Sequence, residues 1–281
     1  MNRNSTMLYS FTLFGHTVPA YGVFLLSGMS VTILCATCFV SRLFGQTRED
    51  VLYCGLIAVV AGLAGAKALS ILLCVGSITS HPEWFGSPAQ IWQFIQSGFV
   101  FYGGLIGGCI GGWVYVWRYR LPVLPFMDIA ATTLPLGHAI GRFGCFLAGC
   151  CYGSHTTCAF GVTFPKSSVH PHGLVSVHPT QLYEAAALLL LFLGLLAFAR
   201  RKPRQGTTTG LYLALYAMVR FVIEFFRADP RGGVLFLSTS QLISIPLFVA
   251  GVLLVSGVFQ NLRPCGRKSL FIRHQPHDAW K

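Results

Sequence analysis

Residues 51–75 read VLYCGLIAVVAGLAGAKALSILLCV and decide the fold class. Only one formal charge, that of Lys67, interrupts this apolar run. About 20 mainly apolar residues in a helix are enough to cross a hydrocarbon core of ~30 Å. The stretch therefore predicts a transmembrane helix.

The rest of the chain repeats this pattern. It has 281 residues with a mean hydropathy of +0.64, and only 10% of them are charged, a balance that water-soluble domains do not keep. We expect one all-α membrane domain over residues 1–281 with about seven transmembrane helices, the first of them retained because it lacks a signal-peptide cleavage site. The fourth predicted run, which His138 and Arg142 interrupt, is a candidate for a broken or partly re-entrant segment. The runs are Val18–Val40, Val51–Val75, Phe99–Trp117, Phe126–Leu147, Leu182–Ala199, Leu211–Phe226 and Leu242–Phe259.

Basic residues in short loops favour the cytoplasmic side and so predict the orientation. Alternate loops and the C-terminal tail hold thirteen Lys and Arg residues, and the other segments hold four. We therefore expect the N-terminus outside, the C-terminus cytoplasmic, an outer-face segment near 151–180 and a basic cytoplasmic tail near 260–281. The net charge of +12 then reflects topology and contact with anionic lipid headgroups, and we expect no nucleic-acid partner.

Three basic residues lie inside predicted helices, where a charge costs roughly 2.5–3.5 kcal/mol on insertion scales and usually marks a paired or functional site. They are Lys67, Arg142 and Arg220. Arg142 follows His138 by four residues, so both should share a helix face.

The sixth predicted helix carries a polar stripe in which Arg220 and Glu224 can form an intrahelical ion pair. Tyr216 and Arg227 extend the stripe at matching spacing. Since a guanidinium binds phosphate oxygens bidentately and stays charged, an excess of arginine here suits a phosphate group.

Two further segments lie at the predicted outer boundary. In the first, Thr180 is the predicted N-cap of the fifth helix with Glu184 in its first turn. Capping does not explain why His178, Gln181 and Tyr183 gather beside them. In the second, Phe101-Tyr102-Gly103-Gly104 opens the third helix, whose further glycine pairs at 107–108 and 111–112 predict close helix packing.

Five of the ten cysteines (Cys35, Cys38, Cys54, Cys74 and Cys109) lie within apolar runs, where cysteine behaves as a small hydrophobic residue. Four others gather at the predicted outer face, where a disulfide or a metal ion is chemically possible. These four are Cys145, Cys150, Cys151 and Cys158.

In order along the chain, these motifs resemble those of the bacterial prolipoprotein diacylglyceryl transferases. The matching segments are Tyr21-Gly22, Gly65-Ala66-Lys67 (where the family usually has Arg), Phe101 to Gly107, Gly141-Arg142-Phe143-Gly144 through Gly153, His178 to Glu184, and Tyr216, Arg220, Glu224 and Arg227.

This chain departs from the family pattern at two places. The family's His-Gly-Gly reads Tyr102-Gly103-Gly104. Its signature Gly-Arg-x-Gly-Asn-Phe-x-Asn-Gly-Glu has lost two Asn and one Glu, and the corresponding residues are Cys145, Ala148 and Cys150. The chain is thus similar to a branch of the family carrying Gly-Cys-Cys-x-Gly.

The resemblance implies a multi-pass enzyme of the bacterial inner membrane with its active site toward the outer leaflet. Such an enzyme transfers the diacylglyceryl group of phosphatidylglycerol to the lipobox cysteine of a prolipoprotein signal peptide and releases glycerol phosphate. Its partners are these two substrates and membrane lipid. No cofactor and no metal are expected.

The resemblance also implies site residues. Arg142 and Arg220 would bind the phosphate and stabilise the leaving group, and Tyr102 would orient or deprotonate the acceptor thiol, with His138 or His178 as alternatives. The other residues expected to bind substrate are Tyr21, Lys67, Gly103, Gly104, Gly141, Gly144, Gly153, Gln181, Tyr183, Glu184, Tyr216, Glu224 and Arg227.

Three other functions remain open on these residues. One is a related transferase with a different lipid donor or acceptor. Another is a transporter of an anionic lipid, because intramembrane arginines also mark transport sites. The last is a thiol-redox membrane protein built around the four clustered cysteines.

The orientation can be tested with reporter fusions. We expect reporters of cytoplasmic location to be active after residues 200–205 and at the C-terminal tail, and inactive within 154–180, because of the basic-residue asymmetry. Reversed signals at these positions would overturn the orientation.

Overall fold

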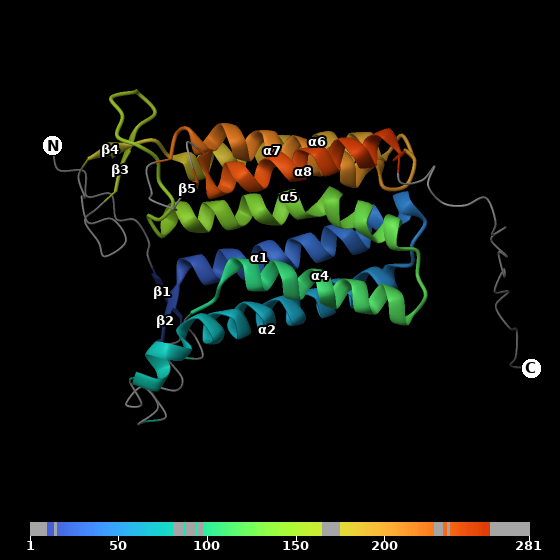
Figure 1. Ribbon diagram of the computed structural model, residues 1–281, viewed down its shortest axis with the longest axis horizontal. Helices are drawn as coiled ribbons and strands as arrows, with labels where there is room; N and C mark the ends of the chain where they lie inside the picture. The colour runs from blue at the N-terminus through green and yellow to red at the C-terminus, as the bar shows by residue number, and fades with distance from the viewer. Residues whose placement is uncertain are drawn as a thin grey trace, which may run out of the picture.

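The computed structural model describes residues 10–13, 16–80, 87, 94, 98–164, 175–227, 233–234 and 237–258. Within this part of the chain, seven helices of 16 residues or more run along the long axis of the molecule (Figure 1). The first helix continues into a π-helix, Ala36–Val40, and a 3-10 turn, Ser41–Phe44. The seven are α1 (Ala20–Cys35), α2 (Arg48–Ser80), α4 (Phe101–Arg118), α5 (Val123–Leu147), α6 (Thr180–Ala199), α7 (Thr207–Glu224) and α8 (Thr239–Ser256).

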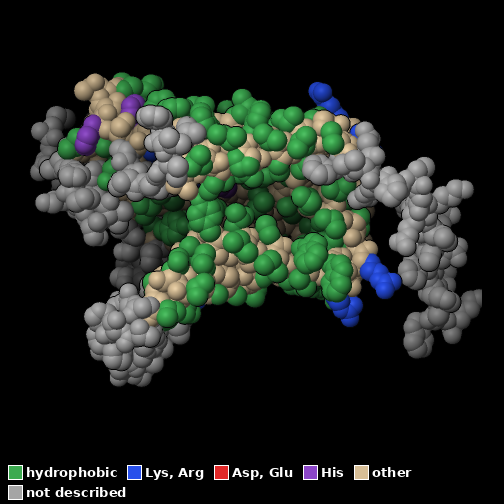
Figure 2. Space-filling model, viewed as in Figure 1, with side chains coloured by type: hydrophobic (Ala, Val, Ile, Leu, Met, Phe, Trp, Pro, Cys, Tyr) green, Lys and Arg blue, Asp and Glu red, His purple; other side chains and the backbone are tan. Residues whose placement is uncertain are grey.

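In the described part of the chain, five of these helices are long and apolar enough to cross a membrane: α1 with its extension, α2, α5, α6 and α8. The glycines of α4 and the threonines, Arg220 and Glu224 of α7 lower the hydropathy of these two helices. Large apolar side chains cover much of the outer surface, which is expected of a protein that lipid surrounds (Figure 2). The structure thus confirms an all-α membrane protein with several spanning helices.

The helices pack in two groups. Helix α5 lies between α1 on one side and α6 and α7 on the other, and α8 packs on α7. Helices α2 and α4 form a separate antiparallel pair next to α1 (Figure 1). The surface is hollowed between this pair and the α5–α8 group (Figure 2).

Glycines set how closely the helices approach. A Cβ atom on Gly65 would lie 2.5 Å from the Gly103 carbonyl oxygen, and one on Gly28 would lie 2.6 Å from that of Gly137. Backbones can therefore touch across α2–α4 and across α1–α5, which small residues permit where no hydrophobic effect drives association. The packing role predicted for Gly107 and Gly111 is confirmed, since Cβ atoms there would also clash with α2.

Helix α5 is continuous from Val123 to Leu147, so the expected break in this segment was wrong. Its helical hydrogen bonding continues through Gly137 and Gly144, where α1 packs closely. The polar side chains that suggested a break, His138 and Arg142, have a carboxylate partner on α6, and this pairing lowers the cost of burying them in a regular helix.

A buried carboxylate anchors the other end of α5. Asp128 is fully buried and accepts hydrogen bonds from the backbone N–H groups of Gly206 (2.6 Å) and Thr209 (2.8 Å) and from the Thr209 hydroxyl (2.7 Å). These N–H groups belong to the first turn of α7, where a helix leaves donors unsatisfied and favours a negative charge. Asp128 therefore fixes the start of α7 against α5.

Three short antiparallel hairpins, which the hydropathy pattern did not predict, cap the opposite end of the bundle (Figure 1). They precede α1, follow α5 and precede α8, and the last leads into a capping box in which Ser238 and Gln241 bond reciprocally. The strands are β1 (Ser10–Leu13), β2 (His16–Pro19), β3 (Val162–Thr163), β4 (Ser176–Val177), β5 (Gly233–Val234) and β6 (Leu237–Ser238).

The close contact of α1 with α5 predicts a contrast between two glycines of α1. We expect Gly28→Ala to lower the thermal unfolding temperature in detergent, because its methyl group would meet the Gly137 carbonyl oxygen at 2.6 Å. Gly22→Ala is the matched control, since nothing lies within 4 Å of a Cβ atom there and alanine favours a helix by ~1 kcal/mol. Equal unfolding temperatures for the two variants would contradict the close approach.

Candidate active site

A buried ion pair joins α5 to α6 near the hairpin-capped end. Arg142 Nη2 lies 2.8 Å from Glu184 Oε1, and the two side chains are 15% and 0% exposed. Glu184 was predicted to take part in capping the first turn of α6. Its carboxylate pairs with Arg142 instead, so this prediction was incomplete. Thr180 was wrongly predicted as the N-cap; Pro179 holds that position and Thr180 is the first helical residue.

His138 adjoins this pair from the next turn of α5. Its Nε2 lies 3.7 Å from Glu184 Oε1, and its ring meets that of Tyr216 edge-on at 5.6 Å between centroids. The expectation that His138 and Arg142 share one face of a helix is confirmed. Tyr216 belongs to α7, so three helices, α5, α6 and α7, meet at this site.

A second ion pair lies on α7. Arg220 Nη2 lies 2.7 Å from Glu224 Oε2, as the four-residue spacing predicted, and also donates to the Ser240 hydroxyl at 2.7 Å. The sequence analysis did not identify Ser240. This residue lies in the first turn of α8, beside the residues that cap the helix, and no charge pattern marks it. Arg227 lies beyond the end of α7, so it does not extend the helical stripe as predicted.

Several buried polar atoms around these pairs have no hydrogen-bond partner within the part of the chain that the structure describes. A polar group buried in this way costs free energy unless a ligand or water satisfies it. These atoms point to a site for a polar ligand between α5, α6 and α7. They are Arg142 Nε, Gln181 Oε1, Glu184 Oε2 and Arg220 Nη1.

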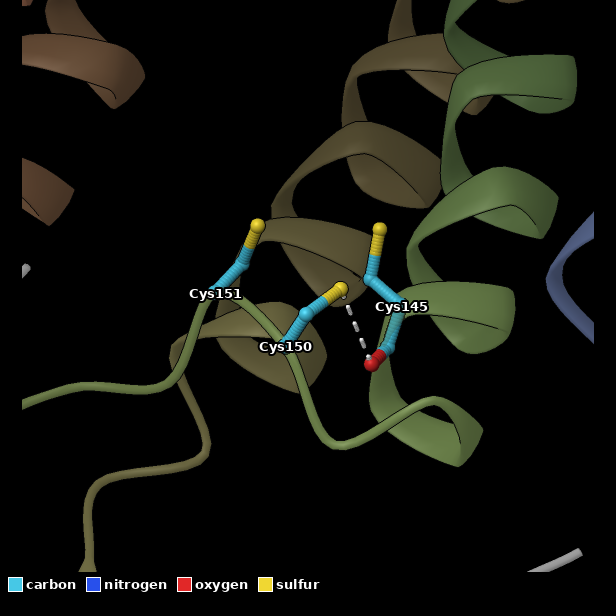
Figure 3. Close-up of side chains that lie close together, drawn as sticks. All are labelled: Cys145, Cys150 and Cys151. Carbon is cyan, nitrogen blue, oxygen red and sulfur yellow. Dashed lines mark hydrogen bonds between the residues drawn. The ribbon is translucent and has the colours of Figure 1, made fainter. Parts of the chain in front are cut away.

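The turn after α5 is fastened to the start of α6 directly beside the site. Gln181 Nε2 donates to the Cys150 carbonyl at 2.5 Å, and Thr180 Oγ1 donates to that of Cys151 at 2.8 Å. The turn brings the sulfurs of Cys145, Cys150 and Cys151 within 4.8 Å of one another (Figure 3).

The Cys150 thiol donates to the Cys145 carbonyl at 3.6 Å (Figure 3). The adjacent Cys145 and Cys150 thiols, and then the Arg227 guanidinium, hold the pKa of Cys151 below its ordinary value. Cys158 is exposed, and all four cysteines predicted to gather here are free thiols, so the disulfide considered possible among them is not formed.

Other predicted residues at this boundary have structural contacts. The ring of His178 lies 3.2 Å from the Tyr183 hydroxyl, measured from Nδ1, and both rings pack on Phe226. Gly153 pairs with Arg227 in an isolated β-bridge, and a Cβ atom on Gly153 would lie 2.8 Å from that of His178. These residues join the end of α7 to the segment that leads into α6.

The residues predicted on the third helix lie in the α2–α4 pair. Tyr102 is half exposed at the start of α4, and Gly103 packs on Gly65 of α2. Gly104 has space toward Ala66, whose Cβ atom a Cβ there would meet at 3.5 Å. Lys67 donates to the Phe94 carbonyl and lies 4.1 Å from the centre of the Phe94 ring. The structure thus does not place these four residues around the two ion pairs.

The remaining predicted residues lie along α1 and α5. Gly144 packs against α1, where a Cβ atom would lie 2.8 Å from that of Phe24 and 3.5 Å from the Tyr21 Cα atom. Gly141 faces open space, since a Cβ atom added there would have nothing within 4 Å. Tyr21 therefore lies beside the end of α5, and Gly141 leaves room next to Arg142.

Comparisons with known proteins identify the family. Residues 9–256 match the family model described as prolipoprotein diacylglyceryl transferase. The phosphatidylglycerol–prolipoprotein diacylglyceryl transferase of Clostridium tetani is 33% identical over 86% of this chain and 94% of its own length. The second such enzyme of Clostridium perfringens is 37% identical over 86% of this chain and 91% of its own. This chain therefore belongs to the prolipoprotein diacylglyceryl transferase family.

Proposed function

We propose that this protein transfers the diacylglyceryl group of phosphatidylglycerol to the cysteine thiol of a prolipoprotein lipobox and releases glycerol phosphate. The observation that carries the proposal is the pair of buried arginines, Arg142 and Arg220. Each is held by a carboxylate, and each keeps a buried guanidinium nitrogen without a hydrogen-bond partner among the described residues. The names of the relatives, which specify phosphatidylglycerol and prolipoprotein, support the same reaction.

The arginines serve the leaving group in this proposal. When the acceptor sulfur attacks the glycerol carbon, the carbon–oxygen bond to phosphate breaks and negative charge grows on the phosphate oxygens. Preorganised cations in a water-poor site stabilise such charge strongly. Glu184 and Glu224 orient the guanidinium groups, and the unfilled nitrogens of Arg142 and Arg220 are left to donate to the phosphate.

Neighbouring groups would bind the glycerol headgroup. His138 Nε2 lies 3.7 Å from Glu184 Oε1, and its ring contacts that of Tyr216, which precedes Arg220 by one turn of α7. His138 and the free amide oxygen of Gln181 are suited to hydrogen-bond the headgroup hydroxyls. The role of Tyr102 toward the acceptor thiol stays a prediction, because its helix, α4, packs on α2 away from these pairs.

The site is proposed to face the outer leaflet of the bacterial inner membrane, with α4 and α7 completing seven spanning helices. Apart from the arginines of the site, the Lys and Arg side chains that stand out on the surface in Figure 2 lie mainly at the end opposite the hairpins, and such residues favour the cytoplasmic side. The hollow beside the α2–α4 pair would give a lipid and a signal peptide a lateral way in (Figure 2).

The arginine assignment is tested by charge-conserving substitution. We expect Arg142→Lys and Arg220→Lys each to slow transfer of labelled diacylglyceryl from phosphatidylglycerol to a lipobox peptide by ~10²–10³-fold. Lysine keeps the charge but loses the planar fork that binds phosphate bidentately.

Arg118→Lys, at the far end of α4, is the matched control and should keep full activity. Thermal unfolding of each purified variant shows that it is folded. Near-normal transfer by both folded site variants would mean that the arginines only hold helices together, and the phosphate assignment would be withdrawn.

A further inference from the structure

Three thiols converge at the end of α5 in a way that the arginine chemistry does not use. Cys145 is in the last helical turn, and Cys150 and Cys151 follow in the turn that leaves it (Figure 3). Their Sγ atoms all lie within 4.8 Å of one another, with Cys145 buried and the other two half-buried. Three ligands on one tetrahedral zinc ion, with Zn–S near 2.3 Å, would have sulfurs about 3.8 Å apart. The observed separations, all within 4.8 Å, come close to that spacing.

The backbone holds this arrangement firmly. The Cys150 N–H donates to the Cys145 carbonyl at 3.1 Å, and the Cys150 and Cys151 carbonyls accept from Gln181 and Thr180. Cys151 has a φ of 62°, a left-handed conformation that is costly for a residue with a Cβ atom. A glycine would adopt this conformation without strain, so the cysteine at position 151 carries a cost in backbone conformational energy.

Two guanidinium groups lie near the cluster. Arg142 precedes Cys145 by three residues on the same face of α5, and the charge of Arg227 acts on the Cys151 sulfur. Three thiolates around a divalent cation carry one net negative charge, which the Arg227 guanidinium would offset, since Arg142 is already paired with Glu184. The cluster contains sulfur ligands only, and thiolate selects zinc and other soft cations over magnesium or calcium.

We propose that Cys145, Cys150 and Cys151 bind one zinc ion and leave its fourth coordination position open. Zinc sites with three protein ligands and an open position are catalytic in form, whereas structural sites are closed by a fourth ligand. The sequence-based expectation of no metal is replaced by this assignment. Two of its three ligands, Cys145 and Cys150, stand at positions where this chain departs from the family signature.

Given the proposed function, the open position takes the acceptor thiol. A thiol that coordinates zinc loses its proton, which passes to water, and binds as the thiolate. The sulfur electron pair then forms the bond to the diacylglyceryl carbon, the bond from this carbon to the phosphate oxygen breaks, and glycerol phosphate leaves toward Arg142 with the electron pair of the broken bond. The thioether product is neutral and a weaker ligand than the thiolate, so it can dissociate from the ion.

Cobalt(II) is a direct probe of this site, because thiolate-bound cobalt absorbs through charge-transfer and d–d bands that zinc lacks. Purified, reduced full-length protein in detergent is titrated with cobalt(II) alone and then with zinc. We expect about one cobalt per chain with tetrahedral thiolate bands, which zinc abolishes by displacement.

Single substitutions locate the ligands. Cys145→Ser, Cys150→Ser and Cys151→Ser should each lose the bands, and Cys158→Ser, a nearby exposed thiol, should keep them. If Cys145→Ser fails to fold, the two half-buried positions still decide the result. Absence of thiolate bands in the reduced protein, or bands that survive in folded Cys150→Ser and Cys151→Ser, would overturn the site. So would a cluster that stays a disulfide after reduction in detergent.

The open position has its own readout, independent of turnover. A lipobox peptide should shift the d–d bands of the cobalt protein, and the same peptide with serine in place of its cysteine should not. Equal spectra with both peptides would overturn the open position. Transfer that fails although cobalt binds would count against the proposed function instead, so the two failures can be told apart.

Discussion

A guanidinium group buried among membrane helices must be neutralised, and the site is organised around this requirement at Arg142. Glu184 meets it from α6 at 2.8 Å and thereby holds α5 to α6. The first turn of α6 in turn fastens the chain that leaves α5, through Thr180 and Gln181. Breaking a buried pair of this kind by removing one partner costs roughly 3–5 kcal/mol, because a charge is left uncompensated. The same ion pair therefore positions the arginine and stabilises this end of the bundle.

Close helix contact supplies the rigidity that such a pair needs. Lipid is as apolar as the helix surfaces, so burial of apolar area does not drive these helices together. Close backbone packing at glycines favours their association instead, at Gly28 with Gly137 and at Gly65 with Gly103. These contacts divide the bundle into the α2–α4 pair and the helices around α5, and the polar site belongs to the second group.

How much could be predicted from the sequence depended on whether two partners lie on one helix. The ion pair of Arg220 with Glu224 and the shared face of His138 and Arg142 follow from helical periodicity, and both were predicted correctly. The partner of Arg142 is 42 residues away on another helix, so no local pattern could identify it. A periodic stripe does not show where its helix ends, and for this reason Arg227 was wrongly assigned to α7. The break predicted in α5 was wrong for a similar reason. The sequence shows that His138 and Arg142 interrupt an apolar run, but it does not show the carboxylate on α6 that makes their burial possible.

The arrangement of the site suggests a physical reason for the departures from the family signature. Thiols are weak hydrogen-bonding groups, so cysteines at positions 145 and 150 cannot replace the amide and carboxylate of the family pattern in kind. What sulfur offers instead is coordination of soft cations. Alkylation of a thiol by a phosphodiester needs cations to receive the leaving phosphate and a nucleophile held as thiolate. Arg142 and Cys145 lie three residues apart on one face of α5, so under the proposed function the two needs are met within one turn of a single helix.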